Sequence, residues 1–170
     1  MGVVKAPTGE LTAPILSFTM LRPATSDDLP FVYESLCDLE ETTLPYPAFE
    51  RIYHANLSNS AVRYVLAEAD NVPVGFASCH VQLLLHHAGP VAEIQELYVR
   101  PDYRSQGVGQ QLIEWFMDEA RQAGWVHLEV TSNRKRQRTH AFYERLGLVW
   151  TSHKFVWKPD SHFDEMGSTP

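Results

Sequence analysis

A short glycine-containing segment between two apolar stretches has the residue types best suited to chemistry. Residues 104–109 read RSQGVG and follow the apolar stretch 91–99, which predicts a buried strand ended by Pro101. After the glycines, apolar residues recur at helical spacing from Val108 to Ala120. A helix that opens on glycines exposes its first backbone N–H groups and the positive end of its dipole. The segment therefore predicts a phosphate-binding turn, to which Arg104 adds a charge-assisted contact.

Two better-known phosphate loops do not fit this segment. It lacks the Gly-Lys-Ser/Thr ending of a nucleoside-triphosphatase loop, so no lysine is placed for a γ-phosphate. It also lacks the third glycine of the dinucleotide fingerprint. Taken alone, the segment leaves a second interpretation open, in which it is only a flexible connection between a strand and a helix.

A second motif downstream gives the first one its context. The pattern Arg-x-x-Gly-x-Gly after Leu-Tyr-Val-x-Pro resembles the acetyl-coenzyme A loop of the GNAT acetyltransferase superfamily. The helix signature of that superfamily is matched by Asn133, Arg136, His140, Phe142, Tyr143 and Gly147. The resemblance spans roughly residues 19–158. Within the superfamily the chain is most similar to the aminoalkylphosphonate N-acetyltransferases, through the segments LHH (85–87), EIQEL (93–97) and ANL (55–57).

This resemblance implies a fold and an activity. The expected fold is α/β (α+β), a mixed and mostly antiparallel twisted sheet of about six to seven strands flanked by about four helices. The expected activity is transfer of the acetyl group of acetyl-CoA to a primary amine of a small molecule, with an aminoalkylphosphonate as the candidate acceptor, by direct attack in a ternary complex. The implied acetyl-CoA contacts are Leu97, Tyr98, Val99, Arg104, Ser105, Gln106, Gly107, Val108, Gly109, Gln110, Asn133 and Arg136.

Acetyl transfer to an amine needs a base, because an alkylammonium group has a pKa near 10 and only the free amine attacks. Glu93 and Glu96 are the candidates on the predicted strand 91–99, and strict alternation places them on opposite faces of the sheet. We expect Glu93 to be the base or a water relay, with Glu96 as the second candidate. Backbone N–H groups between Leu97 and Val99 are expected to hold the oxyanion.

Tyr143 is the candidate for protonating the departing thiolate, a role that the resemblance implies for a tyrosine at this helix position. Helical spacing alone favours a different interpretation, in which Phe142, Tyr143 and Leu146 form the apolar stripe of a core helix.

Three further residues are candidates for the acceptor pocket. His86 and His87 match the resemblance, and the guanidinium of Arg63 suits the oxygens of a phosphonate. No metal site is expected, because two neighbouring strand residues point to opposite faces and supply too few ligands.

Composition limits the classes of function. The 170 residues carry 14 basic and 21 acidic side chains, a net charge of −7, which argues against nonspecific binding to nucleic acid. No stretch is apolar enough to span a membrane. Cys37 and Cys79 form no disulfide framework, so a reducing cytoplasm is the expected location. We expect a flexible extension at 1–16, one acetyltransferase domain at 17–158 and a tail at 159–170, with a homodimer as a possible assembly.

Periodicity and turn signals predict the order of elements. The predicted strands cover residues 17–22, 61–69, 74–85, 91–99 and 125–131, with one or two more within 148–157. The first predicted helix begins at Ser26 and continues to Leu39. The other predicted helices cover 49–57, 108–122 and 134–146, and Gly147 ends the last one.

Two alternative functions remain open at this point. The chain could acetylate a protein lysine or N-terminus, which requires an open peptide groove. It could also be a non-catalytic sensor that binds an acyl-CoA, although a sensor needs neither Glu93 nor Tyr143.

Overall fold

The structure, a computed structural model, describes residues 19–152 and 154–157. The chain divides into two compact units, Met1–Val130 and Thr131–Pro170. Each unit is described by itself. Among the described residues, no helix combines the length and the apolar character needed to cross a bilayer.

The first unit is built on a single sheet whose strand order follows the chain, β1-β2-β3-β4-β5. The strands are β1 (Thr19–Pro23), β2 (Val62–Ala69), β3 (Val72–Leu84), β4 (Gly89–Val99) and β5 (His127–Val130). The first four pair antiparallel, and β5 pairs parallel to β4. This mixed arrangement confirms the expected fold class.

The sheet has five strands in the described part of the chain, so the expected count of six to seven was too high. The predicted strands within 148–157 are not formed in the described residues of that stretch. Val149, Trp150 and Phe155 are all exposed. Alternating apolar residues suggest a strand, but a strand also needs a partner edge with which to pair, and local sequence does not specify one.

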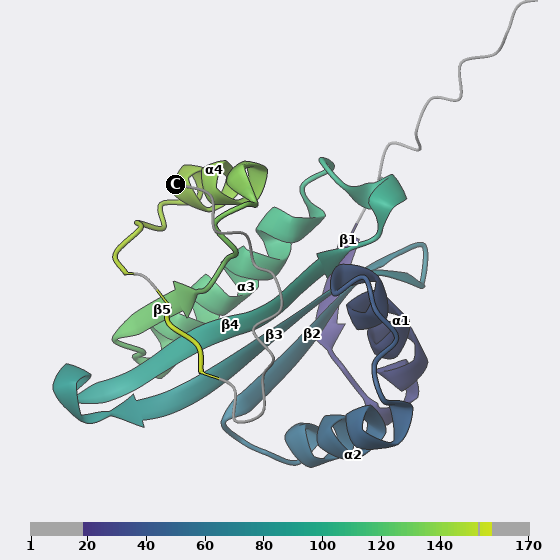
Figure 1. The fold of residues 1–170 in the computed structure, drawn as a ribbon, viewed down its shortest axis with the longest axis horizontal. Coiled ribbons are helices and arrows are strands. Elements are labelled where there is room, and N and C mark those ends of the chain that lie inside the picture. Colours follow the sequence, from purple (N-terminus) through teal and green to yellow (C-terminus); the bar gives the residue numbers. More distant parts are fainter. Residues whose placement is uncertain (1–18, 153, 158–170) are drawn as a thin grey trace, which may run out of the picture. The chain divides into compact units, whose positions relative to one another are not determined.

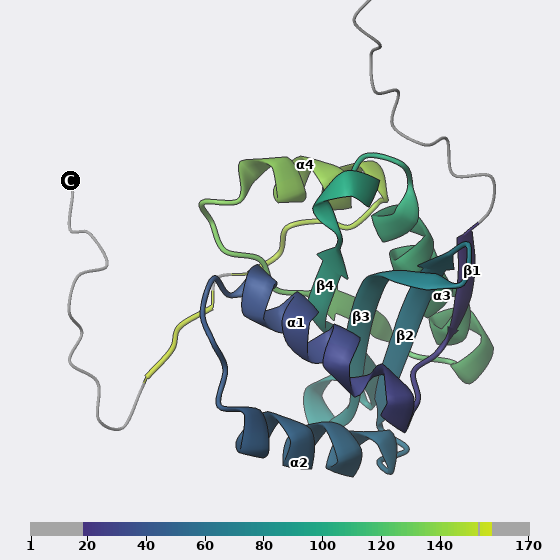
Figure 2. The same cartoon turned by 90° about the vertical axis from the view of Figure 1, so that its right-hand side faces the viewer.

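Helices cover both faces of this sheet. These helices are α1 (Leu29–Leu39), α2 (Tyr46–Leu57) and α3 (Val108–Ala123). The second unit, described by itself, contains the helix α4 (Gln137–Arg145). Short 3₁₀ turns lie at three places: Ser26–Asp28 precedes α1, Leu85–His87 connects β3 to β4, and Pro101–Tyr103 follows β4. Figures 1 and 2 show α1 and α2 on one face of the sheet and α3 on the other.

Each layer is held by apolar side chains at helical or alternating spacing. On the face of α1 and α2, a core cluster joins Val32, Tyr53, Leu66 and Phe76, with Leu29 and Leu36 at its edge. On the opposite face, the apolar stripe of α3 is buried, with Leu112, Ile113 and Phe116 fully excluded from solvent. The first turn of α3 and the strand β4 are therefore fixed relative to each other by packing.

An ion-pair network fastens the start of α1 to the sheet. The guanidinium of Arg22 in β1 lies 2.7 Å from Asp28 Oδ1, and its Nε donates to Glu68 Oε1 at 2.9 Å. Hydrogen bonds from Arg22 hold the pKa of Asp28 below its ordinary value. Because the two carboxylates are largely buried and share one cation, the network orients α1 over the sheet.

Candidate active site

The turn before α3 has the geometry of an anion site. Gly107 stands at the N-cap of α3 with φ of +86°, and Ser105 also has a left-handed backbone, with φ of +61°. The N–H of Gln111 donates to the carbonyl oxygen of Gly107 at 3.0 Å. The preceding amides at positions 108–110 therefore have no acceptor within the helix, as at any α-helix N-terminus. Three amide donors and the positive helix end converge on one spot.

Hydrogen bonds from side chains to backbone carbonyl oxygens stabilise this turn. Arg104 Nε donates to the carbonyl oxygen of Val99 at 2.9 Å, and its guanidinium lies 3.9 Å from Asp38 Oδ2. Gln106 Nε2 donates to the carbonyl oxygen of Asp102 at 2.7 Å. The structure thus uses Arg104 to tie the turn to the end of β4. Its contact with a bound anion stays a prediction.

Among the residues that the structure describes, no strand pairs with the edge of β4 next to this turn. The strand β5 pairs with β4 only over 91–94, from Val91↔His127 to Ile94↔Val130, whereas β4 continues to Val99. The N–H of Arg100 donates to Val74 in β3, and antiparallel bonding alternates along the strand. The N–H groups of Leu97 and Val99 therefore point away from β3, whereas that of Tyr98 points toward it. This narrows the candidate oxyanion donors to Leu97 and Val99.

A bulge in β4 changes the faces of the two candidate bases. Ser78 lies opposite Glu96 and Cys79 lies opposite Ile94, so Gln95 is an extra residue without a partner in β3. Before the bulge, Glu93 lies opposite His80. Since Ser78 and His80 share one face of β3, both glutamates face the side of α1 and α2. The expectation that they lie on opposite faces was wrong, because it assumed unbroken alternation.

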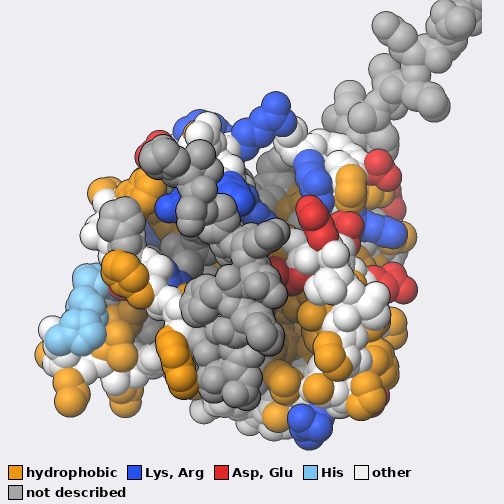
Figure 3. All heavy atoms as spheres, in the orientation of Figure 1, with side chains coloured by type: hydrophobic (Ala, Val, Ile, Leu, Met, Phe, Trp, Pro, Cys, Tyr) orange, Lys and Arg blue, Asp and Glu red, His pale blue; other side chains and the backbone are white. Residues whose placement is uncertain are grey.

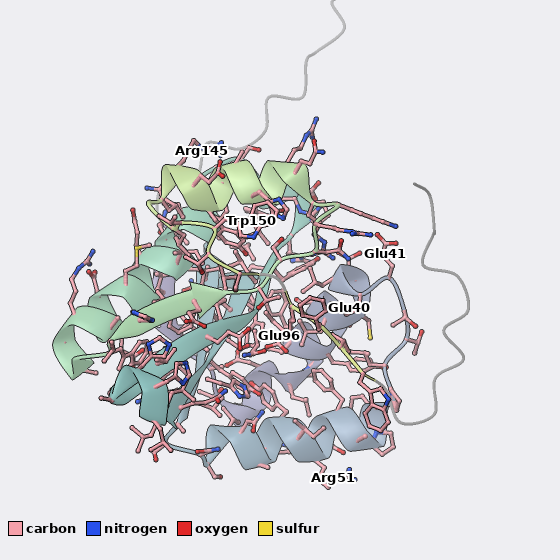
Figure 4. All side chains as sticks on the ribbon, turned by 60° about the vertical axis from the view of Figure 1, so that its left-hand side comes forward. Glu40, Glu41, Arg51, Glu96, Arg145 and Trp150 are labelled. Carbon is pink, nitrogen blue, oxygen red and sulfur yellow. The ribbon has the colours of Figure 1, made fainter. Side chains whose placement is uncertain are left out.

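Glu96 has the environment of a proton acceptor. Burial raises the pKa of Glu96 above the ordinary carboxyl value, whereas the Ser78 hydroxyl lowers it. Ser78 Oγ donates to Glu96 Oε2 and accepts the N–H of Glu96 at 3.2 Å. His80 and Glu40 act on the same carboxyl through their charges. Figure 4 shows Glu96 on β4 and Glu40 at the end of α1.

Sequence reasoning did not select Ser78 and His80. Ser78 is fully buried and bonded to Glu96, and His80 lies across from Glu93. In the sequence both are ordinary members of a strand. Only the cross-strand register brings them to the glutamates, and no local motif marks that register.

The second unit carries three of the predicted site residues. Asn133 Oδ1 accepts the N–H of Lys135 at 3.0 Å, and Arg136 immediately precedes α4. Tyr143 lies on α4 and is buried. Burial raises the pKa of the Tyr143 phenol, which Arg136 lowers in part, so the hydroxyl keeps its proton at neutral pH. The roles of these residues stay predictions.

The predicted acceptor residues lie in two different places. Arg63 Nε donates to Glu119 Oε1 of α3 at 2.5 Å, which directs its guanidinium to the face opposite Glu96. His86 and His87 lie in the 3₁₀ turn between β3 and β4, at the far end of β4 from the α3 turn. The structure brings neither Arg63 nor this pair together with Glu96.

The described residues thus combine a turn with amide donors at a helix start, a strand edge without a partner strand and a half-buried carboxyl on that strand. A profile described as the Acetyltransferase (GNAT) family matches residues 29–148. The chain belongs to this family.

One relative is similar over most of its length. The chain is 43% identical over 136 residues to the aminoalkylphosphonate N-acetyltransferase of Salmonella typhimurium, covering 80% of this chain and 88% of that protein. An uncharacterized N-acetyltransferase of Methanocaldococcus jannaschii is 32% identical over 86 residues, 50% of this chain and 38% of that protein. The chain is thus a GNAT-type acetyltransferase close to the Salmonella enzyme.

Solved structures agree on the fold. A transcriptional regulator from Bacillus halodurans superposes with a TM-score of 0.76 at 21% identity, covering 83% of this chain and 99% of that chain. An aminoglycoside acetyltransferase from a soil metagenomic sample gives a TM-score of 0.74 at 19% identity, covering 86% and 100%. At these identities the likeness concerns the architecture alone.

Proposed function

We propose that the protein transfers the acetyl group of acetyl-CoA to the primary amine of a small aminoalkylphosphonate. The observation that carries the proposal is the 43% identity to the Salmonella enzyme, which extends over 88% of that protein. The turn before α3 supplies donors suited to the diphosphate of coenzyme A. The open edge of β4 supplies donors for the pantetheine amides and the thioester oxygen.

The described residues support a direct transfer. The base in this proposal is Glu96, in place of Glu93, the first candidate from the sequence. The ammonium group of the acceptor gives a proton to Glu96, whose raised pKa makes it a better-matched base than an ordinary carboxylate. The amine lone pair then attacks the thioester carbon, forming the C–N bond. N–H groups of Leu97 and Val99 donate to the oxygen that gains charge. The C–S bond breaks, and the thiolate takes the phenolic proton of Tyr143. The nitrogen loses its second proton as the amide forms, and a proton from solvent restores the phenol.

Coenzyme A release, measured by thiol titration across a panel of amines, tests the acceptor class. The panel contains aminoalkylphosphonates, polyamines, amino acids, aminoglycosides and lysine peptides. We expect the highest kcat/KM for the phosphonates. Uniform failure on phosphonates would reject this acceptor, and a preference for peptides would favour protein acetylation. Heat stabilisation by acetyl-CoA without thiol release from any amine would indicate a sensor.

Substitution of Gly107 tests the turn. Gly107→Ala forces a side chain into a left-handed backbone at φ +86°, which costs about 1–2 kcal/mol. We expect weaker acetyl-CoA binding by calorimetry, because relief of this strain moves the α3 amides. Gly124→Ala is the matched control at the other end of α3, with φ of +68° and open space around it. It should lower the melting temperature similarly and leave acetyl-CoA affinity unchanged. Equal affinity in both variants would contradict a role for the turn.

A further inference from the structure

Three imidazole groups and a carboxylate gather where the β3–β4 hairpin meets β5. His86 and His87 come from the connecting 3₁₀ turn, and His127 and Glu129 come from β5. The ring centroids of His86 and His87 are 4.1 Å apart, and those of His87 and His127 are 4.3 Å apart. Figure 3 shows histidine side chains together on the surface on this side of the molecule. Close packing of imidazole rings, whether neutral or protonated, contributes little to the stability of the fold by itself.

The distances suit a single metal ion. One ligand atom each from His87, His127 and Glu129 lie within 4.8 Å of one another. His127 Nδ1 is 3.7 Å from Glu129 Oε1. Ligand atoms around a tetrahedral ion with bonds near 2.0–2.1 Å are separated by roughly 3.4 Å. His127 and Glu129 are exposed and His87 is half-buried, so small side-chain rotations close the remaining gap.

The backbone builds this cluster from residues 40 positions apart. The parallel register places His127 beside Val91 and Glu129 beside Glu93, so the two ligands of β5 stand two residues apart on one face. The N–H of Val126 donates to the carbonyl oxygen of Pro90 at 2.8 Å and holds β5 against the hairpin. A side chain at Gly89 would bring its Cβ to 2.5 Å from Val126, so glycine is needed for this approach.

We propose that His87, His127 and Glu129 form a binding site for a divalent transition metal ion of the zinc, nickel or cobalt class. Two imidazoles and one carboxylate favour these ions over magnesium or calcium, which prefer oxygen ligands alone. Three protein ligands leave a fourth position for water or for His86. The ion joins the β3–β4 turn to β5, at the far end of β4 from the α3 turn. The earlier expectation of no metal counted only His86 and His87, because the ligands from β5 are remote in sequence.

Calorimetry on untagged protein stripped with a chelator tests the site. Zinc and nickel salts are titrated into the wild type and into His87→Asn, His127→Asn and Glu129→Gln, without substrate. We expect one high-affinity ion per chain, and each variant should weaken binding by at least about tenfold, since even outer partners of metal ligands change affinity by 10–100-fold. His54→Asn removes an exposed histidine of α2 and should bind as the wild type does. Metal binding is measured without acetyl transfer, so the outcome for the metal site does not depend on the proposed activity.

Thermal unfolding supplies the second readout. Zinc should raise the melting temperature of the wild type and of His54→Asn, and not that of His127→Asn, because an ion that binds only the folded chain stabilises it. Equal melting temperatures in chelator would show that the variants fold normally. A wild type that takes up no ion, or ligand variants that bind it as tightly as the wild type, would overturn the proposal.

Discussion

Glu96→Gln lowers the turnover number by a factor on the order of 10²–10⁴ and leaves acetyl-CoA affinity unchanged, because an amide cannot accept the proton of the ammonium substrate. The wild-type rate falls as pH decreases through the raised pKa of Glu96, since only the ionised carboxylate is a base. This acidic limb should be absent from the Glu96→Gln profile. Steady-state kinetics from pH 5 to pH 9 measure both effects.

The melting temperature of Glu96→Gln distinguishes a loss of turnover from misfolding. A carboxyl whose pKa is higher in the folded chain than in the unfolded chain destabilises the fold as pH rises through that interval. Glu96→Gln should therefore raise the melting temperature at pH 8. Glu114→Gln changes an exposed carboxylate of α3 that accepts from Gln110 and should leave turnover unchanged. A fully active Glu96→Gln enzyme would exclude Glu96 as the base.

A substitution at Ser78 also tests the role of Glu96 as the base. Its hydroxyl lowers the pKa of Glu96, so Ser78→Ala should move the acidic limb of the rate profile to higher pH. An unmoved limb would mean that another group sets it, with Glu93 and His80 as the neighbouring candidates.

Tyr143→Phe lowers the turnover number by about 10²-fold or more and leaves coenzyme A affinity nearly intact. A phenol is protonated at neutral pH, and burial raises the pKa of Tyr143 further, so its hydroxyl carries a proton for the leaving thiolate. The ring that fills the core is retained in phenylalanine, which limits the change to the hydroxyl. Single-turnover measurements of thiol release report the step directly.

An exposed tyrosine provides the control for this hydroxyl. Tyr46→Phe removes a phenol from α2, where the side chain is 41% exposed, and should leave turnover unchanged. Wild-type turnover in Tyr143→Phe would remove Tyr143 from the mechanism and favour the alternative in which it only packs in a helix.

The sequence predicted the parts of the site that depend on local structure. The strand, turn and helix around residues 104–110 could be anticipated because glycine, proline and helical periodicity act over a few residues. The left-handed backbone at Gly107 agrees with that interpretation.

The parts that depend on pairing between strands could not be predicted. Nothing in EIQEL marks Gln95 as a bulge, because the segment contains neither glycine nor proline. One extra residue in β4 places Glu93 and Glu96 on the same face of the sheet, the face that also carries Ser78 and His80. The cluster of His87 with His127 depends in the same way on a parallel register between distant segments.

In the proposed complex, the backbone amides before and within the first turn of α3 hold the diphosphate of coenzyme A. Calorimetric titration of the wild type with coenzyme A, and in parallel with pantetheine, which lacks the diphosphate, tests it most directly. We predict one coenzyme A per chain and much weaker binding of pantetheine. Absence of heat with coenzyme A, or equal affinity for the two ligands, would contradict the claim.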